Sequence, residues 1–145
     1  MSLAVLIVDD SPLMRTLIKR IVTLAEASWA EDDPLQDRIH DPIQCYEAGD
    51  GRQALDQLSR TPVDLILTDM NMPGMDGEQF MRELNQRGIL RTTPAIVVST
   101  DATKARVQKM LDLGAVGYIC KPFSPEAMRS ELDRVWIQRQ TGEPA

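Results

Sequence analysis

The sequence predicts an α/β protein built on a five-stranded parallel sheet with helices on both faces. Five short apolar runs alternate strictly with stretches in which apolar residues recur at helical spacing. The runs are almost uninterrupted in their apolar character, which is typical of strands in a parallel sheet whose two faces are both covered. Strict alternation of strand and helix predicts right-handed crossovers between parallel neighbours.

Each strand of this sheet is predicted from an apolar run and the turn residues that bound it. The strands fall at residues 4–8, 43–48, 63–68, 95–99 and 117–120. The first helix is predicted over residues 14–27, with Ile18, Ile21, Val22 and Ala25 on its inward face. Two of the later helices are predicted from residue types that are common at helix ends. Gly114 is placed as a C-cap, and Ser124 followed by Pro125 is typical of a helix start.

The composition excludes several classes of protein. The chain has 145 residues, the size of one domain, and 43% of them are hydrophobic, enough for a core. A formal net charge of -6 makes it a poor candidate for binding nucleic acid through its own field. No apolar run approaches the roughly 20 residues that span a bilayer, and no signal peptide is evident. Because of this charge and the absence of a long apolar run, we expect a cytoplasmic protein with no direct nucleic-acid partner and no membrane partner.

The two cysteines, Cys45 and Cys120, match neither a metal-ligand spacing nor a CxxC redox pair. Each lies within an apolar stretch, so we expect two buried free thiols. Free thiols are typical of a reducing compartment.

Polar side chains follow four of the predicted strands at the point where each strand ends. Asp9 and Asp10 follow the first strand, Asp69 follows the third, Ser99 ends the fourth and Lys121 follows the fifth. Ligands of open parallel sheets bind outside the carboxyl ends of the strands. Each residue alone has an ordinary explanation as a turn, cap or loop residue, but their joint placement predicts a site at this edge.

The residue types at this edge favour a divalent cation and a phosphoryl group. Carboxylates that meet in a partly buried site repel one another unless a positive charge neutralises them. Mg²⁺ prefers oxygen ligands, so Asp9 or Asp10, Asp69 and the backbone carbonyl of Asn71 are its candidate ligands. The charge of Lys121 and the hydroxyl of Ser99 make a place for an anion beside a carboxylate. A carboxylate that attacks phosphorus forms an acyl phosphate.

Four motifs resemble those of the response-regulator receiver domain of two-component signal transduction, and in particular its chemotaxis-regulator type. They are VDDSPLMR at 8–15, DMNMPGMDG at 69–77, VST at 98–100, and the series GA, GY and KPF between 114 and 123. The order and spacing agree from about residue 3 to about residue 138. The resemblance implies the flavodoxin-like fold, a three-layer sandwich of five βα units with strand order 2-1-3-4-5.

The resemblance also implies a role for each site residue. Asp69 would be the phosphorylated residue, and Asp9, Asp10 and Asn71 would hold Mg²⁺ with it. Lys121 would contact the phosphoryl group, and a cis peptide bond would precede Pro122. The two switch residues would be Ser99 and Tyr118. Counting back from Lys121 and Gly114 places the hydroxyl switch on Ser99 and not on the adjacent Thr100.

The partners that the resemblance implies are proteins. The phosphoryl donor would be a phosphohistidine on a sensor histidine kinase or a phosphotransfer protein. It would dock on the first helix, where Met14, Arg15 and Ile18 are the candidate contacts, and on the loop after the fifth strand. Phosphorylation would alter the face made by the last two helices and the fifth strand for a downstream protein target, and dimerisation on phosphorylation is left open. No catalysis is expected beyond the domain's own phosphorylation and dephosphorylation.

The domain organisation predicted is a single receiver domain over residues 1–145, with a core at about 3–138 and a short tail at 139–145. One segment departs from the family pattern. Residues 26–42 are acidic and broken by proline, and they form a longer connection than such folds ordinarily contain. They include His40, the single histidine. We expect a surface insertion that extends the first helix or the loop after it, and its charge is a candidate determinant of partner choice.

Three other classes fit the sequence less well. Phosphatases with an aspartate nucleophile carry a DxD motif after the first strand, where this chain has Asp9-Asp10-Ser11. A flavin carrier of similar fold needs a phosphate loop rich in Ser, Thr and Gly at that point. A pseudo-receiver, which keeps the fold as an interaction module and is not phosphorylated, stays open as the alternative function, because only phosphorylation data separate it from an active receiver.

Overall fold

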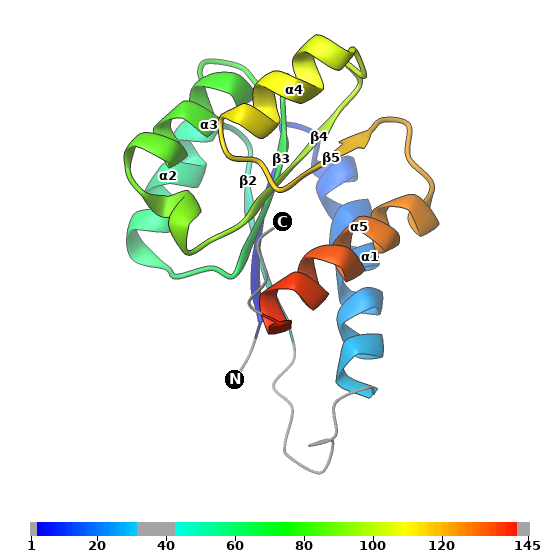
Figure 1. The fold of residues 1–145 in the computed structure, drawn as a ribbon. Helices are drawn as coiled ribbons and strands as arrows, with labels where there is room; N and C mark the ends of the chain where they lie inside the picture. The colour runs from blue at the N-terminus through cyan, green and yellow to red at the C-terminus, as the bar shows by residue number, and fades with distance from the viewer. Residues whose placement is uncertain (1–2, 32–42, 142–145) are drawn as a thin grey trace.

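The computed structural model describes residues 3–31 and 43–141 of the chain. One sheet runs through the centre of the molecule (Figure 1). Its order is β2-β1-β3-β4-β5, and every pair of neighbours is parallel, which confirms the predicted fold and strand order. The strands are β1 (Ala4–Val8), β2 (Gln44–Ala48), β3 (Leu65–Asp69), β4 (Ala95–Ser99) and β5 (Gly117–Cys120).

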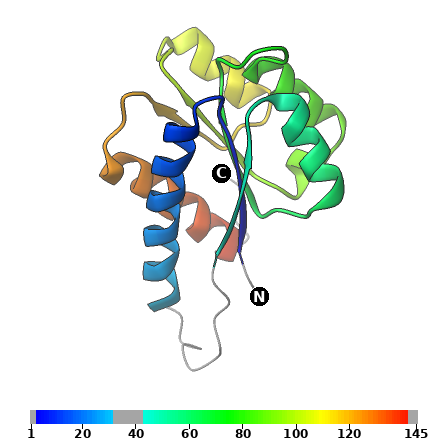
Figure 2. The same cartoon turned by 180° about the vertical axis from the view of Figure 1, so that it is seen from behind.

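Helices cover both faces of the sheet, which gives three layers (Figures 1 and 2). One face packs against α1 and α5, and the other packs against α2, α3 and α4. The helices are α1 (Pro12–Glu31), α2 (Gly51–Arg60), α3 (Gly77–Gln86), η1 (Ile89–Arg91), α4 (Lys104–Asp112) and α5 (Pro125–Thr141).

The three central strands, β1, β3 and β4, are buried on both faces, which explains their apolar runs, whereas the edge strands β2 and β5 are partly exposed. In β1, Val5 and Ile7 pack in the core cluster on the α1 and α5 side, whereas Leu6 and Val8 pack in the cluster on the opposite side. Successive side chains of a strand point to opposite faces, so a strand covered twice needs an apolar residue at every position.

Several boundaries of β2, β3 and α1 differ from those predicted. β3 begins at Leu65, because its ladder with β1 starts where Leu65 lies opposite Val5. It includes Asp69, which pairs with Val98 of β4. α1 continues to Glu31, so residues 26–31 of the expected insertion are helical. Residues 32–42, and His40 with them, lie outside the described residues. Within residues 3–31 and 43–141, no helix combines the length and the apolar character needed to cross a membrane.

The expectation of two buried thiols is wrong for Cys120, which is exposed, while Cys45 is partly buried. β5 is an edge strand of the sheet. A residue at the end of an edge strand has a neighbouring strand on one side only, and the apolar character of the sequence around it does not reveal this.

The junction between β3 and α3 is unusually close. Asp76 caps α3 through a capping box with Gln79, and the N–H of Gly77 donates a 2.9 Å hydrogen bond to the carbonyl of Met70. A Cβ added at Gly77 would lie 2.5 Å from Cα of Met70 and 2.6 Å from the carbonyl oxygen of Asp69. Because those atoms belong to the backbone, α3 can begin this close to the end of β3 only if its first residue is glycine.

We therefore expect Gly77→Ala to lower the free energy of unfolding by roughly 1–3 kcal/mol, the usual cost of inserting a methyl group into a filled space. Urea denaturation measures the change. Gly49→Ala is the matched control, since a Cβ there meets no atom nearer than 3.4 Å, the Oε1 of Gln53. Equal losses in the two variants would contradict the argument from close approach.

Candidate functional site

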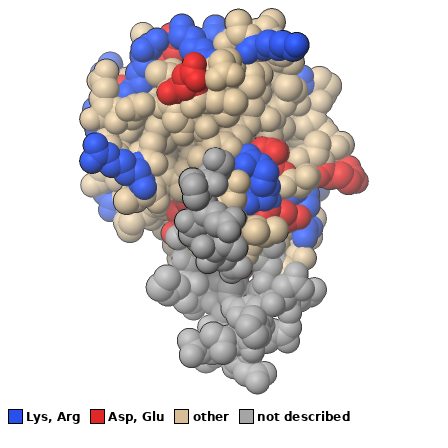
Figure 3. Space-filling view, in the orientation of Figure 1, with Lys and Arg blue, Asp and Glu red and all other residues tan. Residues whose placement is uncertain are grey.

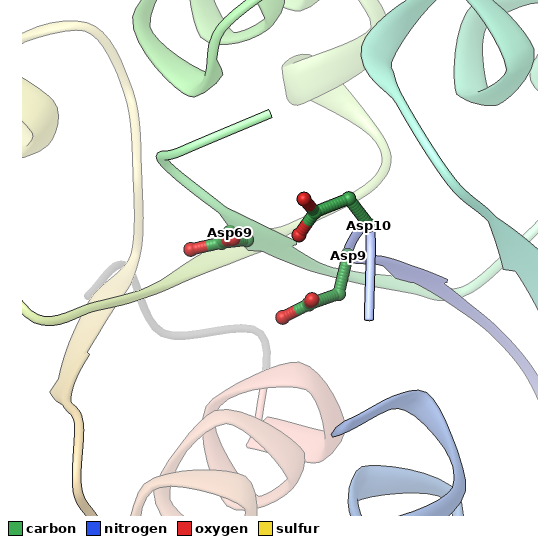
Figure 4. Close-up of side chains that lie close together, drawn as sticks. All are labelled: Asp9, Asp10 and Asp69. Atoms are coloured by element: carbon green, nitrogen blue, oxygen red, sulfur yellow. The ribbon is translucent and has the colours of Figure 1, made fainter. Parts of the chain in front are cut away.

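The ends of β1 and β3 bring three carboxylates together. One oxygen each of Asp9, Asp10 and Asp69 lies within 4.8 Å of the others. Figure 4 shows the three side chains directed into the same space, the first two from the end of β1 and the third from the end of β3. β1 and β3 are neighbours in the sheet, so the parallel pairing itself creates this cluster.

Two of the three carboxylates are buried. Asp9 is 2% exposed and Asp69 is 5% exposed, whereas Asp10 is exposed. Burial raises the pKa of Asp69 above its ordinary value; the charge of Lys121 opposes this, and the charge of Asp9 adds to it. A hydrogen bond from the backbone of Asn71 lowers the pKa of Asp69 by a smaller amount. The cluster is therefore a place where negative charge is costly and a cation is favoured.

Lys121 supplies a positive charge to the two buried carboxylates. Its Nζ lies 3.0 Å from Oδ2 of Asp9 and 3.2 Å from Oδ1 of Asp69. Burial lowers the pKa of Lys121, but the hydrogen bond to Asp9 and the charges of Asp69 and Asp9 raise it more, so the net shift is upward. The peptide bond between Lys121 and Pro122 is cis, as the resemblance implies.

Backbone and side-chain donors orient the carboxylates. The N–H of Ser11 donates to Oδ1 of Asp9 at 2.9 Å, and the N–H of Met70 donates to Oδ1 of Asp69 at 2.8 Å. Arg15 donates from Nη1 to the carbonyl oxygen of Asp9 at 2.6 Å, and its Nε pairs with Glu47 on β2 at 2.9 Å. Arg15 therefore holds the end of β1 from the side of α1.

These residues fit Mg²⁺. Ligands at about 2.0–2.1 Å in an octahedron lie roughly 2.9 to 4.2 Å from one another. Carboxylate oxygens within 4.8 Å of one another need only small movements to reach that geometry. Asn71 is exposed beside Asp69, and the role of its carbonyl as a ligand stays a prediction.

Ser99 and Tyr118 meet at one residue of the loop between β4 and α4. Ser99 is fully buried, and its Oγ accepts a hydrogen bond from the N–H of Asp101 at 3.1 Å. The hydroxyl of Tyr118 donates to the carbonyl oxygen of Asp101. The adjacent Thr100 is exposed, and the assignment of the hydroxyl switch to Ser99 stays a prediction.

The docking prediction on α1 needs one correction. Ile18 is 2% exposed and packs in the core, so it is not available to a partner. The helical spacing that groups Ile18 with Ile21 already placed it on the inward face. Met14 and Arg15 are partly exposed. Among the residues of α1 whose exposure the structure describes, the most exposed large apolar side chains are Leu13, at 81%, and Leu24, at 63%, and both lie outside the inward stripe.

We expect Lys121→Gln to lower the free energy of unfolding by roughly 2–4 kcal/mol in a buffer containing EDTA, because it leaves two buried carboxylates without their counter-charge. Adding Mg²⁺ should recover more of the stability of this variant than of the unmodified protein. Urea denaturation with and without Mg²⁺ measures both effects. Lys104→Gln, which removes an exposed lysine at the start of α4, is the control. Equal losses of stability in the two variants would mean that the ammonium group of Lys121 does not offset the charge of the buried carboxylates.

Comparison with known families gives a match over most of the chain. The family model described as the response regulator receiver domain matches residues 31–133. This range includes Asp69, Ser99 and Lys121, and Asp9 and Asp10 precede it.

Curated relatives cover nearly the whole chain. The chain is 34% identical over 131 residues to a chemotaxis protein CheY homolog of Campylobacter jejuni, covering 90% of this chain and 89% of the relative. It is 29% identical over 135 residues to chemotaxis protein CheY-3 of Vibrio cholerae, covering 93% and 92%.

Solved structures show the same architecture. The chemotaxis response regulator CheY4 of Vibrio cholerae superposes with a TM-score of 0.73 at 30% identity, covering 93% of this chain and 99% of that one. A CheY-like receiver domain protein from Methanospirillum hungatei reaches a TM-score of 0.77 at 19% identity, which is a likeness of fold alone.

Proposed function

Because the chain belongs to the response-regulator receiver family, we propose that it accepts a phosphoryl group on Asp69 in a reaction that needs Mg²⁺. The observation that carries the proposal is the cluster of Asp9, Asp10 and Asp69, with oxygens within 4.8 Å of one another. A cluster of this kind beside Lys121 can neutralise an incoming phosphoryl group while it presents a carboxylate to the phosphorus.

In the proposed transfer, a carboxylate oxygen of Asp69 attacks the phosphorus of a phosphohistidine. A bond forms between that oxygen and phosphorus, the bond between phosphorus and the imidazole nitrogen breaks, and the imidazole leaves with the electron pair. Mg²⁺, held by Asp9, Asp10, Asp69 and the carbonyl of Asn71, would stabilise negative charge on the phosphoryl oxygens. Lys121, whose Nζ lies 3.2 Å from Asp69, would move its contact to a phosphoryl oxygen. The N–H of Met70 keeps Asp69 oriented.

The proposed output is a shift between two states of the face formed by α4, β5 and α5. The phosphoryl group adds about -1.5 to -2 charges next to the buried hydroxyl of Ser99. The Ser99 hydroxyl can donate a hydrogen bond to a phosphoryl oxygen. Because its Oγ also accepts from the N–H of Asp101, a movement of Ser99 would shift this loop residue. Tyr118 bonds to the same residue, so the two side chains would respond together.

The partners of the proposal are a sensor histidine kinase or phosphotransfer protein as the donor and an unnamed protein as the target. Met14 and Arg15 remain candidate contacts for the phosphoryl-donor protein. Leu13, the exposed apolar residue that directly precedes Met14, is a third candidate. We also propose that the chain is one receiver domain in the cytoplasm and that residues 26–42 contribute to partner choice by charge. The alternative function is a phosphorylation-independent pseudo-receiver.

Intact-mass spectrometry after incubation with a small-molecule phosphodonor tests the acceptor chemistry. We expect one phosphoryl adduct that requires Mg²⁺ and is absent from Asp69→Asn, because that variant lacks the nucleophilic carboxylate. Asp56→Asn, an exposed carboxylate of α2 that pairs with Arg60, is the matched control and should keep the adduct. A folded protein that forms no adduct and does not bind fluoroberyllate would favour the pseudo-receiver.

The switch is tested separately from the acceptor. We expect Ser99→Ala to form the adduct but to lose most of the change in hydrogen exchange that fluoroberyllate with Mg²⁺ causes in α4, because the hydroxyl that contacts the phosphoryl group is gone. Thr100→Ala, which alters the exposed neighbour, should respond as the unmodified protein does. An unchanged response in Ser99→Ala, or a lost response in Thr100→Ala, would assign the switch to another residue.

A further inference from the structure

α4 is held to the rest of the molecule mainly by polar contacts. All nine of its residues are described, and Met110 is the one that is buried. By contrast, α3 buries Phe80, Met81 and Leu84 besides its first residue. A helix with one buried apolar residue gains little from the hydrophobic effect, so charged and hydrogen-bonded contacts decide where it lies.

Two residues on one side of α3 hold α4 along its length. Glu78 accepts from Nζ of Lys109 at 2.9 Å and from Nη1 of Arg106 at 3.0 Å. Two turns later, Nδ2 of Asn85 donates to the carbonyl oxygen of Leu113, the C-cap of α4, at 2.8 Å. The hydrogen bond and the charge of Lys109, together with Arg82 and Arg106, hold the pKa of Glu78 below its ordinary value. α3 and α4 lie side by side (Figure 1), and basic side chains gather over this part of the surface (Figure 3).

Arg106 reaches a second carboxylate besides Glu78. Its Nε lies 3.6 Å from Oδ2 of Asp101 in the loop before α4. Oδ1 of Asp101 accepts from the N–H of Thr103 at 3.0 Å and from its hydroxyl at 2.8 Å. Thr103 in turn caps α4 by accepting from the N–H of Arg106. The loop and the start of α4 therefore form one hydrogen-bonded unit, which Arg106 joins to α3.

This unit ends at the switch residues. Asp101 donates its N–H to Oγ of Ser99 and accepts the hydroxyl of Tyr118 on its carbonyl oxygen. The position of Asp101 therefore affects whether the Tyr118 hydroxyl keeps its hydrogen bond to the loop carbonyl.

We propose that Arg106 is a positioning residue, which joins Glu78 of α3 to Asp101 and thereby holds the loop carbonyl that binds the Tyr118 hydroxyl. A guanidinium suits this task because its planar fork offers several N–H donors in fixed directions, whereas the single ammonium of lysine is a point charge. The inference concerns the unphosphorylated protein, so it holds or fails independently of the phosphoryl chemistry.

The expected size of the effect follows from exposure. The side chains of Glu78, Arg106 and Asp101 are 24%, 35% and 43% exposed, so solvent weakens their attraction. Losing Arg106 should lower the ratio of docked to released Tyr118 by up to roughly fivefold, which is the upper end of what one exposed ion pair supplies.

Fluorine NMR of protein labelled with 3-fluorotyrosine tests the proposal without any phosphodonor. The chain has two tyrosines, and Tyr46→Phe assigns the signal of Tyr118. We expect Arg106→Gln to move the Tyr118 signal toward that of a solvent-exposed tyrosine while the Tyr46 signal stays in place. Glu78→Gln should move it in the same direction, and Arg106→Lys should fall between the unmodified protein and Arg106→Gln.

Arg129→Gln is the matched control, because Arg129 is also 35% exposed and pairs with a carboxylate, Asp133, at 3.1 Å within α5. Salt near 1 M, where the screening length is about 3 Å, should shift the Tyr118 signal of the unmodified protein and leave that of Arg106→Gln almost unchanged. A Tyr118 signal that is the same in Arg106→Gln and in the unmodified protein would overturn the proposal. So would an equal shift in Arg129→Gln, because the effect would then be general and not local to the bridge.

Discussion

The repulsion between carboxylates at the ends of β1 and β3 is the constraint on which the rest of the site depends. Parallel pairing places Asp9 and Asp69 side by side, and both are buried. Two buried negative charges in contact would destabilise the fold without compensation. Lys121 comes from the far strand β5 to within 3.0 Å of Asp9 and 3.2 Å of Asp69, and backbone N–H groups orient each carboxylate. The site is therefore an arrangement of charge that a cation and a phosphoryl group can both complete.

The same protein divides into parts that are held by burial and parts that are held by polar contacts. α1, α3 and α5 each present several fully buried apolar side chains to the sheet, and moving any of them would expose apolar surface. α4 buries Met110 and is also held by polar contacts with Glu78 and Asn85 of α3. Partly exposed ion pairs contribute little individually. A helix held in this way can change position at a small cost in free energy. α4 is such a helix, and it follows the loop whose residue Asp101 bonds to both Ser99 and Tyr118.

Membership of the receiver family accounts for the fold and for the order of the motifs, and several structural features of this chain lie outside those motifs. The family model matches from residue 31, although β1 and the two aspartates that follow it, Asp9 and Asp10, lie before that residue. α1 runs from Pro12 to Glu31, through the beginning of the segment at 26–42 that the sequence predicts to be an insertion. The exposed Leu24 lies in the second half of this helix. The bridge from Glu78 through Arg106 to Asp101 is likewise built from side chains outside the motifs that carry the resemblance.

The sequence by itself determined the class of fold, the strands and the residues at their carboxyl ends. The reason is that the pattern of apolar residues is local. A strand buried on both faces must be apolar at every position, so the polar residue that ends it is easily recognised. It also predicted Ser99 over Thr100 by counting along the motifs. The tertiary structure alone decided that Cys120 is exposed at the end of an edge strand. It alone brought Glu78 to Arg106, 28 residues away. Such contacts depend on how two helices lie against the same sheet, and no spacing within either helix encodes that.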